Sequence, residues 1–140
     1  YPSGTAAAAA ALITMASLSG DQEWRNLADE TLAALAELQR DHPRFAGWSL
    51  AALAAARNGP TEVAIVTGPD DDGGDLLRAA VRHGPGGLVV ARGSGDTPPL
   101  LAGKSAVGRA TAYVCRNFSC SAPVTRDDDL AQLLDDARVR

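Results

Sequence analysis

The sequence predicts a mixed α+β fold, in which a helical segment over residues 1–59 precedes a small α/β subdomain over 60–140. Apolar residues recur every three to four positions in the first part, which is typical of amphipathic helices. In the second part, two β-branched apolar runs, 62–68 and 86–93, flank a short amphipathic segment. Such a unit requires parallel strands joined by a right-handed crossover. With a further strand at 110–115, we expect a three-stranded, partly parallel sheet.

The helical segment divides into three expected helices. A hydroxyl side chain near residue 3 can cap the first helix, and Gly20 can end it. Asp21 is placed to cap the second helix, which Pro43 ends because proline lacks the amide donor of a helix interior. A third helix follows over 46–59. The second helix carries one continuous face, formed by Trp24, Leu27, Ala28, Thr31, Leu35 and Leu38.

Two loops and a closing helix are expected in the subdomain. An acidic loop at 67–74 precedes a helix over 75–84, and a loop rich in proline and glycine covers 94–109. A closing helix begins at Thr125 or Asp127, either of which can cap it.

The composition excludes several classes of protein. The 140 residues are 46% hydrophobic but only 4% aromatic, and their net charge of −4 leaves no basic stripe for a nucleic-acid backbone. The apolar stretch 6–16 is too short to span a bilayer and lacks the basic start of a signal peptide. We therefore expect a cytoplasmic protein that binds no nucleic acid, no membrane and no cofactor.

The first helix is built largely from alanine. Small side chains allow another helix to approach closely, and the three helices show no obvious way to enclose one another's apolar faces. We therefore expect an exposed apolar face on residues 1–58 that packs against helices outside this chain or against a second copy.

Two stretches resemble a known family. The stretch "YPSGTAAAAAALITMASLSGD" is similar to its "PSGNS" segment, and "PLLAGKSAVGRATAYVCRNFSCSAPVTRDDDLAQLL" is similar to its closing signature. The family is usually called thioredoxin-domain-containing, and its animal members are described as spermatogenesis-associated. The resemblance runs in order from Pro2 to Leu134. It implies a parent protein with a thioredoxin-like domain and an α/α-barrel similar to six-hairpin glycosidases and sugar epimerases. This chain would be its C-terminal portion, and the rest of the parent chain its main partner.

The same resemblance implies candidate ligand-binding residues. It places the turn Ser3, Gly4 and Thr5 at the helix starts that line a barrel cleft, with Thr5 where the family has asparagine. The alternative is that this turn simply caps the first helix.

Cys115 and Cys120 are the only cysteines. Four residues separate them, unlike the two of a thioredoxin-type motif, and a strand precedes them. Along a continuous strand they would point to opposite faces. We expect two unpaired structural cysteines; a local disulfide formed by a turn at 116–119 and a metal or redox role are the alternatives.

The other candidates have simpler interpretations. His83 is expected to end its helix, where a cation suits the helix dipole. His42 is expected to be an exposed turn residue, and Lys104 to lie on a surface loop. Trp24 and Trp48 are expected in the core, with the lining of a sugar cleft as the alternative. The loop 67–74 matches no nucleotide-binding fingerprint, and no metal site is expected.

Three functions remain open from the sequence. We favour a structural C-terminal portion of a larger protein, without a self-contained active site. The second is a carbohydrate-processing barrel segment, which needs two carboxyl groups flanking the scissile bond. Glu23, Glu30 and Glu37 give no such pair by their spacing. The third is a thiol-redox accessory module that uses Cys115 and Cys120.

Overall fold

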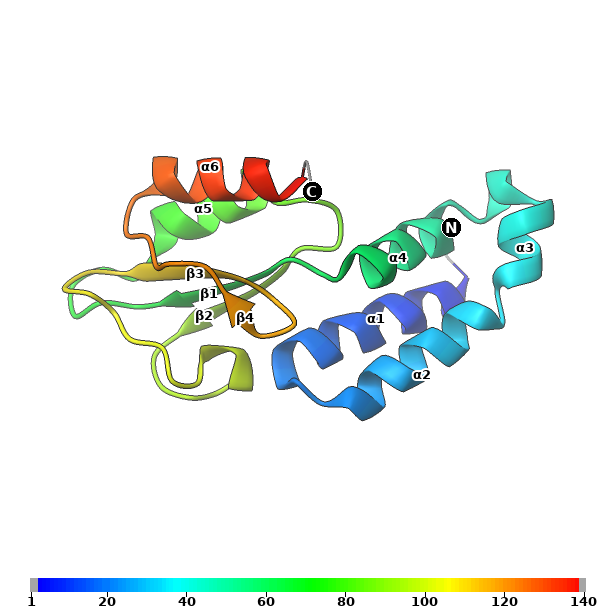
Figure 1. The fold of residues 1–140 in the computed structure, drawn as a ribbon, viewed down its shortest axis with the longest axis horizontal. Helices are drawn as coiled ribbons and strands as arrows, with labels where there is room; N and C mark the ends of the chain where they lie inside the picture. Colours follow the sequence, from blue (N-terminus) through cyan, green and yellow to red (C-terminus); the bar gives the residue numbers. More distant parts are fainter. Residues whose placement is uncertain (1–2, 139–140) are drawn as a thin grey trace.

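The structure, a computed structural model, describes residues 3–138 and has an α+β architecture with a four-stranded mixed sheet. Helices α1–α4 lie beside one end of the sheet, and α5 and α6 cover one of its faces (Figure 1). The α-helices are α1 (Gly4–Ser19), α2 (Gln22–Ala33), α3 (Ala36–Asp41), α4 (Gly47–Asn58), α5 (Gly74–His83) and α6 (Asp127–Arg138). The strands are β1 (Glu62–Val66), β2 (Val89–Gly93), β3 (Thr111–Arg116) and β4 (Ser119–Cys120), and two 3₁₀ helices are η1 (Pro43–Phe45) and η2 (Pro99–Leu101).

The strand order in the sheet is β2-β1-β3-β4. Strands β1 and β2 are parallel, which confirms the predicted strand–helix–strand unit, and β3 runs antiparallel to β1. The prediction of three strands is wrong by one, because β4 turns back and pairs with β3. A strand of two exposed residues has no hydrophobic alternation by which its sequence can be recognised.

Strand β1 is buried on both faces, as its continuous apolar run predicted. Val63 and Ile65 pack into a cluster with α5 and α6. The other face packs on Leu100 and Leu101 of η2, which are fully buried. The loop expected at 94–109 therefore contains a helical turn that closes the underside of the sheet, visible below the strands in Figure 1.

The predicted helix ends are confirmed around α1 and α2. The Ala6 N–H donates to Ser3 Oγ at 3.2 Å, so Ser3 caps α1. Gly20 ends α1 with a φ of 72°, which favours glycine, and the Glu23 N–H donates to Asp21 Oδ1 at 2.9 Å. The tight turn between α1 and α2 thus follows directly from two adjacent residues in the sequence, Gly20 and Asp21.

The second predicted helix is interrupted, contrary to the expectation of one continuous element. Helix α2 stops at Ala33, and α3 restarts at Ala36 after Leu35, whose ψ of 1° departs from helical geometry. Helix α2 is held by Ala28 and Leu32, both buried, whereas α3 buries none of its residues. Packing against α1 therefore stabilises only the first part of the predicted helix.

The packing of α1 partly overturns the expected open face. Helix α1 lies between α2 and α4, and its Ala9 and Ile13 form a cluster with Ala28 and Ala52 of those helices. The helices therefore do enclose part of their apolar surface. Other large apolar side chains of this segment remain exposed, namely Met15, Leu27, Phe45 and Trp48.

Trp48 is 55% exposed, so its expected place in the core is wrong, whereas Trp24 is half-buried. Trp48 stands at the start of α4, where it lines an apolar groove together with Ala10 of α1, Ala51 of α4 and Leu88. Within residues 3–138, no helix combines the length and the apolar character needed to cross a membrane.

Candidate functional site at the junction of helices and sheet

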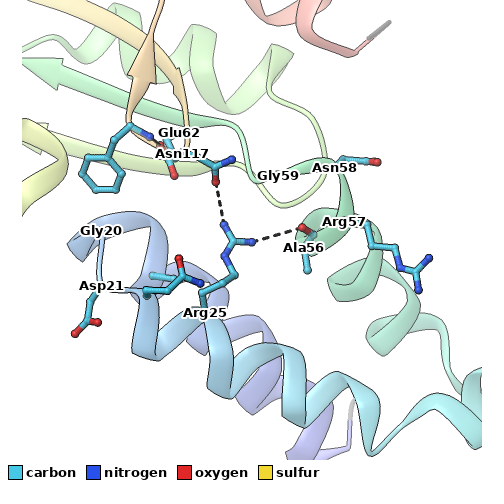
Figure 2. A pocket seen from close by; sticks show the side chains of 12 residues that line it. Gly20, Asp21, Arg25, Ala56, Arg57, Asn58, Gly59, Glu62 and Asn117 are labelled. Carbon is cyan, nitrogen blue, oxygen red and sulfur yellow. Dashed lines mark hydrogen bonds between the residues drawn. The ribbon is translucent and has the colours of Figure 1, made fainter.

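A polar pocket of about 490 Å³ lies where the ends of α1 and α4 meet the start of α2, the first residue of β1 and the β3–β4 turn. We call it the seam pocket. Its lining residues are Ala16, Gly20, Asp21, Gln22, Arg25, Ala56, Arg57, Asn58, Gly59, Glu62, Asn117 and Phe118 (Figure 2). It joins segments up to about a hundred positions apart in the chain, so only the tertiary fold assembles it.

Glu62 is the buried carboxyl group of the seam pocket. It opens β1 and is only 1% exposed, and the Phe118 N–H donates to its Oε2 at 3.1 Å. Burial raises the pKa of Glu62 above its usual range, an effect larger than the opposing ones of this hydrogen bond and of the cations Arg25 and Lys104. The buried Ser17 hydroxyl lies close enough to lower this pKa slightly, although it makes no hydrogen bond of standard geometry within the described chain.

Arg25 of α2 connects three elements. Its Nη2 donates to Asn117 Oδ1 at 3.2 Å, and its Nη1 is 3.5 Å from the Ala56 carbonyl oxygen near the end of α4. Figure 2 shows the guanidinium at the centre of the pocket, reaching towards both partners, while Arg57 points away from it. A planar guanidinium can serve both partners at once because its donors diverge in a fixed fork.

The β3–β4 turn carries the groups that face Arg25 and Glu62. Asn117 and Phe118 adopt φ values of 47° and 63°, so they form the two-residue left-handed turn that suits the twist of a β-hairpin. Asparagine adopts this conformation readily, whereas for phenylalanine it is strained. The position of Phe118 therefore depends on the contacts that hold it.

The two cysteines flank this turn and are joined. Cys115 and Cys120 are paired across β3 and β4, and their sulfur atoms form a disulfide with an S–S distance of 2.09 Å. The expectation of two unpaired cysteines on opposite faces is therefore wrong. The chain reverses at Asn117 and Phe118, so the cysteines are neighbours on two strands rather than successive positions along one.

The Phe118 ring ties the turn to the helices. A Cβ atom on Gly20 would lie 3.0 Å from Phe118 Cζ, so the ring packs against the glycine that ends α1. Through its ring and its amide, Phe118 contacts both the helical segment and β1. Glycine at position 20 is required both by its φ of 72° and by this close approach.

The polar groups of the seam pocket are largely committed to these contacts. Glu62 accepts from the Phe118 amide, Arg25 donates to α4 and to the turn, and Asp21 caps α2. In the described part of the chain, no group of three or more His, Cys, Asp or Glu side chains is arranged to hold a metal ion. The arrangement fastens the sheet to the helices, with a protonatable carboxyl group beside a disulfide.

The predicted ligand residues Ser3, Gly4 and Thr5 are exposed at the start of α1, and they do not line the seam pocket. The capping interpretation of Ser3 is confirmed by its hydrogen bond. A ligand-binding role for these three residues stays a prediction.

The histidines lie where the sequence placed them. His83 ends α5, and its Nδ1 is 3.4 Å from Asp135 Oδ2 of α6, so it links the two helices that cover the sheet. His42 is an exposed residue after α3. Lys104, expected on a surface loop, is half-buried, and its charge is felt by Glu62.

The acidic loop at 67–74 is held by hydrogen bonds and an ion pair of Asp71, and is not simply solvated. Asp71 accepts from the N–H groups of Gly73 at 3.0 Å and Ala110 at 3.2 Å, and it pairs with Arg109. The Gly73 N–H in particular lowers the pKa of Asp71. This aspartate therefore connects the loop to the residues just before β3, which is a structural role.

Sequence reasoning missed the four residues that build the seam pocket: Arg25, Glu62, Asn117 and Phe118. One signal was present, since Glu62 is an acid at the start of an apolar run that was correctly predicted to be buried. Arg25 gave no comparable signal, because it is one of several charged residues on a helix.

Comparison with protein-family models, with curated proteins and with solved structures gives no match for this chain.

Proposed function

We propose that the chain is the C-terminal structural portion of a larger thioredoxin-like and α/α-barrel protein, with no self-contained active site. The stretch around Cys115 and Cys120 resembles the closing signature of that family, and this resemblance supports the proposal. In this role, the α/β subdomain braces the helices of residues 1–59 by holding their ends against the sheet.

The main support for this proposal is that the polar side chains of the seam pocket bond to other parts of the same chain. Its arginine and its buried carboxyl group contact the chain itself, through Asn117, the Ala56 carbonyl and the Phe118 amide. A ligand site instead presents convergent polar groups to its ligand. The polar chemistry of the pocket is therefore better suited to joining elements than to binding a substrate.

The exposed apolar side chains support a partner on the helical segment. Phe45 is 83% exposed and Trp48 is 55% exposed, and aromatic residues so placed are typical of surfaces that another helix or domain covers. We propose that the remainder of the parent chain covers them, with a second copy through helices 1–58 as the alternative partner.

The carbohydrate-processing alternative receives less support. Hydrolysis needs two carboxyl groups on either side of the scissile bond. Glu23, Glu30 and Glu37 are exposed and lie outside the seam pocket. The two acids that line it, Asp21 and Glu62, each accept a backbone hydrogen bond.

A cytoplasmic setting is part of the proposal, and the disulfide bears on it. Disulfides persist mainly in oxidising compartments, so in a reducing cytoplasm Cys115 and Cys120 would exchange between bonded and thiol forms. Rapid alkylation of thiols in intact cells, followed by mass analysis, measures the fraction of each form.

The bracing role is tested by Arg25→Ala. Losing the contacts to Asn117 and Ala56 is expected to lower the free energy of unfolding by about 1–2 kcal/mol. Urea unfolding measures it. Arg57→Ala is the matched control, since this exposed arginine lines the same pocket but points away from Arg25, and its effect is expected to stay within about 0.5 kcal/mol.

A second measurement separates bracing from catalysis. Monosaccharides and disaccharides are titrated into ¹⁵N-labelled protein, and the amide shifts of the seam pocket are followed. We expect no saturable change. Saturable shifts at Glu62, Arg25 or Asn117, together with equal stabilities of the two arginine variants, would refute the structural role.

A further inference from the structure

The disulfide and the buried carboxyl group stand in one row across the sheet, and the strained turn lies between the two cysteines in the chain. Glu62 of β1 is paired with Cys115 of β3, and Cys115 is paired with Cys120 of β4. Directly paired residues point to the same face of a sheet, so all three side chains share a face. The turn that follows Cys115 carries the contacts to Arg25 and Glu62.

We propose that the Cys115–Cys120 bond is a thiol-exchange site that latches the β3–β4 turn onto the helices, so that its reduction releases Asn117 and Phe118 from the seam pocket. This inference rests on the proposed bracing function, and it adds that the redox state of the disulfide regulates the brace. The co-reactant is a dithiol, either a small molecule or a protein, that is oxidised to its own disulfide.

The two sulfur atoms differ in access, which sets the direction of attack. Cys120 is exposed, whereas Cys115 is 1% exposed. A thiolate of the dithiol attacks Cys120 Sγ, the S–S bond breaks, and its electron pair leaves on Cys115 Sγ as a thiolate. The second thiolate of the dithiol then attacks the mixed disulfide and releases Cys120. One disulfide is reduced to two thiols, and one dithiol is oxidised.

The leaving Cys115 thiolate is buried and needs a proton. Glu62 lies opposite it on the neighbouring strand and the same face, so its carboxyl group is the group placed to deliver this proton. The charged groups facing Glu62 are Arg25 from α2 and Lys104 from the loop before β3. On the side of α6, Asp136 lines a hollow together with Cys115.

Reduction acts on the turn because the turn is strained. Phe118 has a φ of 63°, a conformation that bulky residues rarely adopt. The disulfide holds the turn at its base, while Glu62, Arg25 and Gly20 hold it at its tip. Without the bond at its base, the two-residue strand β4 is expected to separate and the contacts at the tip to weaken.

The test measures amide hydrogen exchange in the oxidised protein and in the protein reduced by dithiothreitol. The Phe118 amide is expected to exchange at least about tenfold faster after reduction, as its hydrogen bond to the Glu62 carboxyl group is lost. The Ile65 amide, in the centre of the sheet, is expected to change little. The double variant Cys115→Ala, Cys120→Ala should show the fast rate with and without dithiothreitol. Equal Phe118 rates in the oxidised and reduced chain overturn the latch.

The proton donor is tested by the rate of reduction. Glu62→Gln is expected to slow reduction by dithiothreitol several-fold, whereas Asp136→Asn is expected to leave the rate unchanged. Brief alkylation followed by mass analysis is expected to find the mixed disulfide on Cys120. Equal rates for Glu62→Gln and native chain remove Glu62 from the mechanism, and trapping on Cys115 refutes the direction of attack.

Failure of the latch and failure of the brace give different results. A latch that fails leaves Arg25→Ala destabilising while reduction changes nothing at Phe118. A brace that fails leaves the two arginine variants equally stable, whatever reduction does.

Discussion

Glu62 is the single residue whose chemistry the fold changes most. It is nearly fully buried at the start of β1 and is surrounded by one amide donor and two cations, yet burial still raises its pKa. The folded state therefore holds the Glu62 proton more tightly than the unfolded state does. Stability from this group is fully present below the ordinary glutamate pKa of about 4.3, and it is lost as the pH rises through the raised value.

Replacing this carboxyl group by an amide should remove that dependence. We expect Glu62→Gln to become progressively more stable, relative to native protein, as the pH rises from about 4 to 7, because an amide oxygen still accepts from Phe118 and never ionises. Urea unfolding across this range measures the difference. Glu23→Gln, at an exposed position, is the control. A constant difference between Glu62→Gln and native protein would show that Glu62 titrates normally.

Gly20 tests the contact between the turn and the helices. Gly20→Ala is expected to cost about 1 kcal/mol for its left-handed backbone, plus a further cost for displacing the Phe118 ring. Gly103→Ala is the matched control, since Gly103 has a φ of 68° and an added Cβ would meet no atom within 4 Å. Thermal unfolding should therefore rank Gly20→Ala as more damaging, and Phe118→Ala should abolish the excess.

Among the elements, the 3₁₀ turn η2 departs most from expectation. Its segment reads as a polar loop, but Leu100 and Leu101 are fully buried beneath the sheet. Strand β1 has apolar side chains on both faces, so its lower face needs a cover, and η2 supplies it. This turn therefore belongs to the core of the subdomain.

Truncating one of these leucines measures that role. Leu100→Ala is expected to lower the free energy of unfolding by about 2–5 kcal/mol, since it leaves a cavity under β1. Val107→Ala, in the same loop at a side chain that is 62% exposed, is expected to cost less than about 0.5 kcal/mol. Comparable effects of the two changes in urea unfolding would mean that η2 is not part of the core.

The helices show which of their ends can be predicted from neighbouring residues and which cannot. Ser3, Gly20 and Asp21 mark helix ends by their side-chain chemistry, and the structure confirms all three. The break between α2 and α3 has no such marker. It occurs where packing against α1 stops, so it depends on a contact between helices rather than on the residues at the break.

The molecule as a whole has an asymmetric surface. The helical segment exposes Phe45, Trp48, Met15 and Leu27, whereas the sheet carries helices on one face and η2 on the other. Figure 1 shows α3 projecting away from the sheet at the far end of the helices. We expect the exposed apolar residues to make the isolated chain self-associate.

This association should depend on the helical segment specifically. Trp48→Ser is expected to shift the monomer–oligomer equilibrium towards monomer by several-fold, measured by sedimentation velocity over a range of concentrations. Val81→Ser removes a side chain that is 69% exposed on α5, and it is expected to have no effect. A native chain that stays monomeric at all concentrations, or an equal effect of Val81→Ser, would contradict this role.

The sequence by itself determined the α+β class, the helix ends around Gly20, the parallel β1–β2 pair and the burial of β1 on both faces, because these depend on local periodicity and on side chains that act within a few residues. The tertiary structure decided the rest. The Cys115–Cys120 bond needs a reversal at Asn117 and Phe118, and the seam pocket needs Arg25 and Glu62 to meet that reversal. Such contacts join distant positions whose residue types carry no local period, so only the folded chain reveals them.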